Sequence, residues 1–381
     1  MRNITSSASF ADSKPHYEIL DGLRSVAALL VIWYHVFEGF ATSPVDQRFN
    51  HGYLAVDFFF VLSGFVVGYA YDDRWKRMRL GDFFKRRLIR LHPMLVMGVL
   101  LGALSFMVQG SVKWDGTPVA LSDVMLATLL GLFLIPALPG SAPEVRGNGE
   151  MFPLNGPSWS LFFEYIGNVL YALFLRRLST RWLTVWVVLT GAGLASFALF
   201  NLSGFGHLGV GWSLLDYNLP GGLLRMMFSF SVGLLMSRLF KPVHIRGAFW
   251  WCSLGVAILL CVPHLGTGGA WWHNGLYDSL CVLFAFPLLV WLGASDQTTD
   301  HASTRVCKFL GDISYPLYII HYPFMYLFYA WVWRKELSFS QAWPVATAVF
   351  LGSILLAYLC LKLYDEPVRR WLSRKFLERK P

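Results

Sequence analysis

The chain has 381 residues, of which 55% are hydrophobic and 17% aromatic, while only 14% are charged. Together with a mean hydropathy of +0.49, this composition excludes a soluble globular domain and indicates a polytopic membrane protein. The net charge of +9 does not indicate nucleic-acid binding, because the basic residues lie between apolar runs, as the positive-inside bias of membrane proteins requires.

Apolar runs that could span a membrane recur along most of the chain. They lie at about 23–40, 53–71, 91–109, 122–138, 158–175, 183–202, 218–238, 248–264, 276–293, 310–333 and 342–364. Basic segments separate some of them and are expected to face the cytoplasm. The clearest are Arg74 to Arg90, Arg176 to Arg181, Arg238 to Arg246 and Arg369 to Lys380.

If all four basic segments lie on one side, one of these runs must not cross the membrane. The weakest run is 122–138, which is short, opens beside Asp123 and ends in PALPG, so we expect a re-entrant or interfacial segment there. The sequence therefore predicts an all-α fold of about ten transmembrane helices with both termini in the cytoplasm. The predicted units are an N-terminal tail at 1–16, a transmembrane domain at 17–371 and a basic tail at 372–381.

The first apolar run carries an arginine near its start and a histidine inside it. Arg24 and His35 are eleven positions apart, which on a helix with a rise of about 1.5 Å per residue places the imidazole roughly 16 Å deeper. That depth is near the middle of a hydrocarbon layer about 30 Å thick, where an ionisable group should face protein or a water-filled cavity. We interpret His35 as a catalytic candidate. The alternative is a neutral imidazole that satisfies a polar group of a neighbouring helix.

Other runs place polar residues at a similar depth. Asp57 and Glu164 lie in runs that enter from the far side, and His321 lies near the middle of the run 310–333. A carboxylate beside a buried imidazole fixes its tautomer and stabilises the imidazolium, so Asp57 or Glu164 is a candidate partner of His35. Which of the two reaches the histidine stays open. The alternative is that they pair with Arg225 or cap broken helices.

A basic cluster precedes the third apolar run. It comprises Lys85, Arg86, Arg87 and Arg90, which with Arg24 would form a basic mouth below His35. Guanidinium groups bind phosphates bidentately, so this mouth is a predicted site for an anionic, phosphate-bearing ligand from the cytosol. The alternative is that these arginines fix the topology and contact the headgroups of membrane lipids.

Several motifs of nucleotide-binding proteins and hydrolases are missing from the sequence. GxxxxGK[ST], GxGxxG and GxSxG do not occur, so nucleotide-cradle and hydrolase interpretations lack a motif. Five cysteines are scattered without ligand spacing, so we expect neither a metal site nor a disulfide framework.

These stretches together resemble the acyltransferase 3 family of integral-membrane O-acyltransferases, over residues 17–371. Six motifs carry the resemblance, in order along the chain. They are the Arg24 and His35 pair; G-x-x-x-V-D-x-F-F-V-L-S-G-F from Gly52 to Phe65, with Asp57; R-R-x-x-R-x-x-P from Arg86 to Pro93, with Arg87 and Arg90; W-S-x-x-x-E at Trp159, Ser160 and Glu164; S-Y-x-L-Y-x-x-H-x-P from Ser314 to Pro323, with Tyr315 and His321; and E-P at Glu366 and Pro367.

The resemblance implies an enzyme that transfers an acyl group, acetyl by default, from cytosolic acyl-CoA to a hydroxyl of a carbohydrate or a lipid-linked or secreted glycan. It implies that His35 is the essential residue, as general base or acyl relay, and that the arginines meet acetyl-CoA, a co-substrate and not a bound cofactor. A bacterial inner membrane is the expected location. Supporting roles are expected for two carboxylates, Glu164 and Asp57, and acceptor-binding or orienting roles for Trp159, Ser160, His321 and Tyr315.

A transporter or proton channel is the alternative from another functional class. In it, His35, Asp57, Glu164 and His321 would relay protons without covalent chemistry. Paired broken helices in two related halves would favour this alternative. The sequence shows no such internal symmetry.

Overall fold

The computed structural model describes residues 14, 16–43, 45–266, 268–298 and 300–377, and over these ranges the regular structure is helical. Most of the predicted N-terminal tail and residues 378–381 of the predicted basic tail lie outside the described residues. The α-helices are α1 (Glu18–Glu38), α2 (Ala55–Tyr71), α3 (Leu80–Gln109), α4 (Leu121–Leu132), α5 (Ser158–Leu173), α6 (Thr180–Leu199), α7 (Asn218–Leu239), α8 (Ala248–Cys261), α9 (Trp272–Leu280), α10 (Phe286–Ala294), α11 (His301–Ile320), α12 (Tyr322–Arg334), α13 (Phe339–Cys360) and α14 (Glu366–Phe376).

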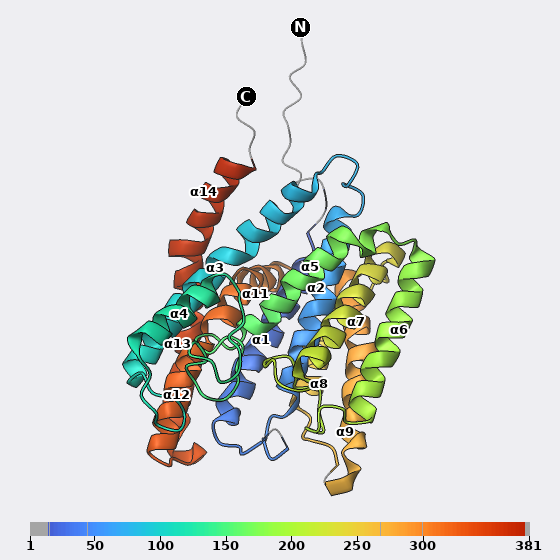
Figure 1. Cartoon of the computed structure of the whole chain (residues 1–381). Coiled ribbons are helices and arrows are strands. Elements are labelled where there is room, and N and C mark those ends of the chain that lie inside the picture. Colours follow the sequence, from blue (N-terminus) through green and yellow to red (C-terminus); the bar gives the residue numbers. More distant parts are fainter. Residues whose placement is uncertain (1–13, 15, 44, 267, 299, 378–381) are drawn as a thin grey trace.

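The helices form a bundle of the kind that a polytopic membrane protein requires (Figure 1). Within the described ranges, eight helical segments are long and apolar enough to cross a membrane, and they correspond to eight of the ten predicted spans. The other two are α8, with only 14 residues, and the run 310–333. The structure divides that run between α11 and α12 at His321, where Pro323 follows in the first turn of the new helix.

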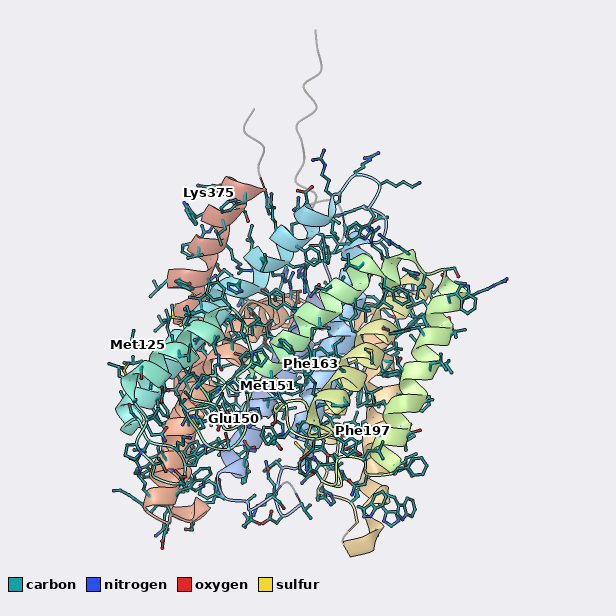
Figure 2. The ribbon with its side chains drawn as sticks, in the orientation of Figure 1. Met125, Glu150, Met151, Phe163, Phe197 and Lys375 are labelled. Atoms are coloured by element: carbon teal, nitrogen blue, oxygen red, sulfur yellow. The ribbon has the colours of Figure 1, made fainter. Side chains whose placement is uncertain are left out.

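The run 122–138 forms the short helix α4 followed by an irregular segment. A helix of 12 residues is about 18 Å long, which is less than the thickness of a hydrocarbon layer. One face of α4 packs against α3, while Leu121, Met125 and Leu129 on its outer face are exposed. Figure 2 labels Met125 on that outer face. The helix is therefore too short to span alone and presents apolar side chains away from the bundle.

The basic segment that precedes the third run is mostly helical, although the sequence suggested a loop from Arg74 to Arg90. Helix α3 already begins at Leu80, and the carboxylate of Asp82 in its first turn accepts a hydrogen bond from the backbone N–H of Arg79 at 3.3 Å. Phe83, Arg87 and Leu91, spaced four apart on one helix face, are all buried. Helical spacing therefore turns Arg87 toward the interior.

The two ends of the bundle differ in charge. One end carries the start of α3, the end of α7 and helix α14, and we call it the basic end (Figure 1). Lys375 of α14, labelled in Figure 2, lies there. Arg238 of α7 forms an ion pair of 2.7 Å with Asp72, just after α2. The loop residues at 41–43, 45–50, 200–217, 262–266 and 268–271 lie at the other end, which we call the far end.

Helices α2 and α7 make the most extensive helix–helix contact in the described part of the bundle. A Cβ on Gly64 would lie 1.9 Å from the carbonyl oxygen of Phe230, and one on Gly233 would lie 2.1 Å from the carbonyl oxygen of Val61. Only glycine permits this approach of two backbones, as in other membrane helix pairs.

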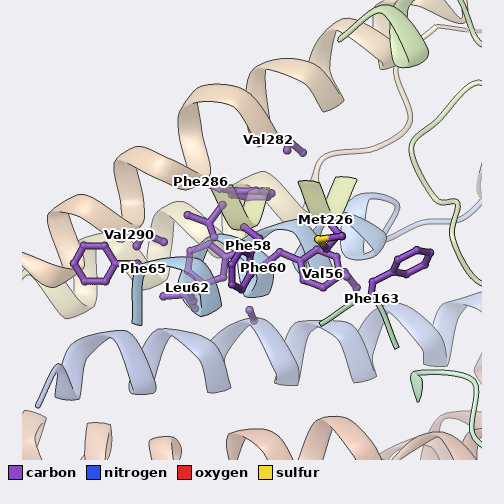
Figure 3. Packing of buried hydrophobic residues seen from close by; sticks show 14 of the residues in the cluster. Val56, Phe58, Phe60, Leu62, Phe65, Phe163, Met226, Val282, Phe286 and Val290 are labelled. Atoms are coloured by element: carbon purple, nitrogen blue, oxygen red, sulfur yellow. The ribbon is translucent and has the colours of Figure 1, made fainter. Parts of the chain in front are cut away.

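Aromatic side chains of α2 fill the space on the other side of this contact. Phe58, Phe60 and Phe65 are fully buried, and the ring of Phe58 lies 5.6 Å from that of Phe286 in α10. Figure 3 shows these residues between the neighbouring helices. The packing fixes α2 and α7, which carry Asp57 and Arg225.

Replacement of Gly64 by alanine should destabilise the protein by about 2 kcal/mol or more, because the new methyl group can fit only if α2 and α7 separate. Thermal unfolding in detergent would measure the loss. Gly352→Ala is the matched control, since nothing lies within 4 Å of a Cβ at that position on α13. Equal melting temperatures for the two variants would contradict the close contact.

Candidate active site

His35 lies in the last turn of α1 and is hydrogen-bonded to a carboxylate of the same helix. Its Nδ1 is 2.6 Å from Oε2 of Glu38, and the hydroxyl of Tyr329 donates to the same oxygen at 2.9 Å. When Nδ1–H donates to the carboxylate, Nε2 carries the lone pair and is free to act as a base or nucleophile. We call this pair the His35–Glu38 dyad.

Glu38 is the partner that the sequence analysis missed. It follows His35 by three positions, a spacing that brings two side chains together on one helix face. The sequence signal was present, since Glu38 lies inside the apolar run 23–40, but no role was assigned to it. Neither Asp57 nor Glu164, the predicted partners, is hydrogen-bonded to His35 in the described structure.

His321 lies beside the dyad at the break between α11 and α12. The imidazole rings of His35 and His321 are stacked, 5.5 Å apart at an angle of 29°. The Nδ1 of His321 is 2.9 Å from the carbonyl oxygen of Tyr318 and 3.1 Å from that of Leu317, so Nδ1 carries the proton. Its Nε2 is buried and has no hydrogen-bond partner among the described residues. A neutral acceptor atom is therefore available next to the dyad.

Asp57 forms a buried ion pair with Arg225, which is the alternative to a pair with His35 that the sequence left open. The Nη2 of Arg225 is 2.6 Å from Oδ2 of Asp57, and neither side chain has any solvent exposure. Arg225 also donates to the carbonyl oxygens of Val210 at 2.6 Å and Tyr53 at 2.7 Å. The ring of Trp159 lies 5.3 Å from its guanidinium. This pair joins α2 and α7 to the loop before α7.

Glu164 pairs with an arginine of the basic cluster. Its Oε1 accepts a hydrogen bond from Nη2 of Arg87 at 2.6 Å and one from the hydroxyl of Ser63 at 2.5 Å. The contact joins α5 to α3 and α2. It holds the guanidinium of Arg87 at the wall of an internal cavity.

That cavity, near the basic end, has a volume of about 100 Å³. Three guanidinium groups and one carboxylate line it, so its charge suits an anion. Arg24, on this wall, also pairs with Asp21 at 2.8 Å, whereas Arg86 is not part of the lining. The predicted site residues in the lining are Arg24, Arg87, Arg90, Ser160, Glu164 and Tyr315.

A second cavity, of about 440 Å³, lies toward the far end and contains the dyad. We call the two spaces the basic-end cavity and the far cavity. Val56 and Tyr318 line both of them, and the hydroxyls of Tyr318 and Ser160 are 2.8 Å apart. The cavities therefore meet at one thin wall, with His35 on the far side of it. Trp159, Arg225 and His207 also line the far cavity.

His207 lies in the loop between α6 and α7 and is held neutral. Its Nδ1 accepts a hydrogen bond from the backbone N–H of Gly209 at 2.9 Å. Burial, together with the nearby His264, Arg225 and His51, lowers the pKa of His207 to about 3. The sequence offered no signal for this residue, because its surroundings come from distant segments.

Comparison with known proteins gives the site its context. The sequence model of the acyltransferase 3 family, described as an acyltransferase domain, matches residues 17–362. A Streptomyces mycarofaciens protein named "Acyltransferase MdmB" is 24% identical over 93% of this chain and 92% of its own length. "Protein 2 in picA locus" of Rhizobium radiobacter is 35% identical over 43% of this chain and 84% of its own.

A more distant relative is longer than this chain. The Staphylococcus aureus (strain COL) protein named "Putative O-acetyltransferase SACOL0978" is 23% identical over 80% of this chain, which spans only 50% of that protein. No solved structure matches the chain.

Asp57→Asn should cost about 3–5 kcal/mol of stability, because it leaves the charge of Arg225 buried and uncompensated. Thermal unfolding in detergent measures this cost. The double variant Asp57→Leu with Arg225→Met removes both charges and should recover much of the loss. An Asp57→Asn protein with the wild-type melting temperature would contradict a structural role.

The low pKa of His207 predicts acid sensitivity of the far-end loops. The folded pKa of about 3 lies below the usual unfolded value of about 6.5, so the unfolded state binds the extra proton. Stability should therefore be complete above about pH 6.5 and fall as the pH drops toward 3. In His207→Asn, whose Oδ1 can still accept from Gly209, melting temperatures between pH 6.5 and 4 should fall less steeply. An identical slope in both proteins would contradict this prediction.

Proposed function

We infer that this chain, an integral-membrane acyltransferase of the acyltransferase 3 family, moves an acyl group from cytosolic acyl-CoA to a hydroxyl of a carbohydrate acceptor. The donor is acetyl-CoA by default, and the acceptor is a free, lipid-linked or secreted glycan. One observation carries the proposal: the His35–Glu38 dyad lies in a cavity that meets a second, arginine-lined cavity from the other end. Such an arrangement suits a donor and an acceptor that approach from opposite sides.

The basic-end cavity is the proposed donor site. Arg24, Arg87 and Arg90 contribute guanidinium groups to its lining, and each guanidinium has five N–H donors, so the carboxylates on Arg24 and Arg87 leave donors available for phosphate. Arg86 would contact parts of the donor outside the cavity. Tyr315 donates to the carbonyl oxygen of Leu91 at 2.5 Å and lines this cavity, so we assign it to the donor side and not to the acceptor.

In the direct mechanism, Nε2 of His35 accepts the proton of the acceptor hydroxyl while the oxygen attacks the thioester carbonyl. Glu38 holds Nδ1–H and stabilises the imidazolium as it forms. The new C–O bond replaces the C–S bond, and the imidazolium returns its proton to the leaving thiolate. The products are the O-acyl acceptor and free coenzyme A.

A relay would use the same atom as a nucleophile. Nε2 of His35 would attack the thioester carbonyl, break the C–S bond and release the thiolate of coenzyme A, which leaves an acyl-imidazole. The acceptor hydroxyl would then attack the acyl carbon and break the C–N bond, and its proton would balance the charge of the thiolate. The two routes differ in one observable, since only the relay leaves label on His35 after exposure to donor alone.

On the acceptor side, the far cavity supplies several polar and aromatic groups. His321 is fully buried outside the lining of the far cavity and stacks on His35, so we assign it an orienting role beside the dyad. Trp159 lines the far cavity, and Ser160 is hydrogen-bonded to Tyr318 in the wall between the cavities. These positions support acceptor binding for Trp159 and a wall-forming role for Ser160.

We further propose that the protein lies in a bacterial inner membrane with its basic end in the cytoplasm. Arginines at the ends of α5 and α7 and along α14 gather at that end. The positive-inside bias then places both termini in the cytoplasm. This orientation gives the basic-end cavity access to cytosolic acyl-CoA.

His35→Ala should abolish acyl transfer, and Glu38→Gln should lower it by about 10²-fold or more, because the imidazole loses its orienting charge. Membranes that express each variant would receive radiolabelled acetyl-CoA, and chromatography would separate the labelled products. Asp216→Asn, an exposed far-end carboxylate outside both cavities, is the matched control. Wild-type activity in either dyad variant, at equal protein levels, would defeat the proposed function.

A further inference from the structure

The far cavity extends into a side pocket of about 230 Å³ at the far end of α12. The two spaces share a wall that includes Glu38 and Tyr322, so the pocket begins beside the dyad. Glu150 also belongs to this shared wall, whereas Trp114 and Trp333 line only the side pocket. Figure 2 shows Glu150 in the coil region close to α1 and α12.

The aromatic wall of this pocket is exposed but fixed in place. Trp333 is 47% exposed, yet its indole N–H donates to the carbonyl oxygen of Gly39 at 2.9 Å. Its ring stacks on Tyr329 at 5.4 Å and 18°, and Trp114 meets it edge-on at 4.9 Å. Trp333 is thus fixed in orientation at the pocket lining, with nearly half of its surface exposed.

A buried arginine supports the opposite wall. The guanidinium of Arg146 lies 3.5 Å from the ring centre of Tyr326, and it donates to the carbonyl oxygen of Pro153 at 2.8 Å and to Gln109 at 2.7 Å. Arg146 is only 1% exposed. It therefore fixes the position of Tyr326 and is not itself part of the pocket lining.

Glu150 is the polar group at the centre of this wall. The hydroxyl of Tyr326 and the side-chain amide of Asn148, at 2.7 Å, both donate to its oxygens. Burial raises the pKa of Glu150, and these two hydrogen bonds together with the charge of Arg146 oppose that rise. Among the described residues, the pocket lining contains two carboxylates and no cationic side chain.

The fixed aromatic side chains and the two carboxylates of the lining together restrict the class of ligand that this pocket can bind. A pyranose ring has an apolar face of C–H groups and a rim of hydroxyls, so it needs an aromatic surface and hydrogen-bonding groups together. A lipid tail would cover the carboxylates of Glu38 and Glu150 with hydrocarbon and offer them no hydrogen bond in place of water. An acidic sugar would bring its charge close to Glu38 and Glu150, which is unfavourable.

We propose that this pocket is a subsite for one pyranose ring of the acceptor, and that it selects neutral or amino sugars over acidic ones. The C–H face of the ring packs on Trp333, and its hydroxyls bond to Glu150 and Asn148. The shared wall at Glu38 then directs a hydroxyl of that ring, or of the next one, toward His35. The link to acyl transfer rests on the proposed function, whereas the binding of the sugar does not.

Saturation-transfer NMR on the full chain in lipid nanodiscs tests the subsite without an acyl donor. The probes are methyl glucoside, methyl glucosaminide and methyl glucuronide at matched concentrations. Signals are expected from the first two sugars and at least about threefold weaker signals from the glucuronide. In Trp333→Ala the signals should largely disappear. In Trp343→Ala, which removes an exposed tryptophan of α13 outside the pocket, they should persist.

Three results would overturn the proposal: no signal from any glycoside, equal signals in Trp333→Ala and Trp343→Ala, or a glucuronide that binds as well as the glucoside. Glu150→Gln provides a separate check, because it should raise glucuronide binding relative to glucoside without loss of the aromatic surface. Unchanged discrimination in that variant would contradict the role of charge.

The test of the sugar subsite can be separated from the test of the proposed function. Donor-dependent labelling that requires His35, in a protein that binds no glycoside, would keep the acyltransferase and remove the sugar subsite. Glycoside binding in a protein whose labelling does not depend on His35 would keep the sugar subsite and remove the proposed role of His35 in acyl transfer.

Discussion

An ionisable side chain inside a membrane needs a partner from the protein, since an unpartnered charge there costs several kcal/mol. Two carboxylate–arginine pairs beside the cavities link different helices: Asp57 and Arg225 have no solvent exposure, and Arg87 and Glu164 keep 6% and 16%. The dyad differs from both. It lies within one helix, and its His35 and Glu38 keep 17% and 38% exposure. The pairs between helices therefore hold the bundle together, whereas Glu38 of the dyad is the most open of these carboxylates.

This division also weighs against a proton relay through the bundle. The relay considered from the sequence needs Asp57 and Glu164 as proton carriers, yet each is held by an arginine. Val56 and Tyr318 form a wall between the two cavities. A reactive group at such a wall suits the transfer of a group from one bound substrate to another.

The sequence predicted what depends on local pattern. Run lengths and hydropathy identified eight of the ten expected spans, whereas His35, expected near the middle of the layer, lies in the last turn of α1. The pair of Asp57 with Arg225 was an alternative that the sequence left open, and the structure shows it. Prediction failed where distant segments decide the outcome, as for the arginine partner of Glu164 and for the neutral His207. The sequence also did not show which arginine faces the cavity. That depends on where α3 begins, and the structure has Arg87 and not Arg86 in the cavity wall. The roles of the site residues themselves stay predictions.

The most direct test of the account is vectorial transfer in proteoliposomes of known orientation. Radiolabelled acetyl-CoA would be supplied outside, and a glycan extract from the native cells would be sealed inside. The account predicts labelled glycan in the lumen when the basic end faces outward, and none when it faces inward. Label that appears only when donor and glycan share one side, or no label in either orientation, would contradict transfer between the two cavities.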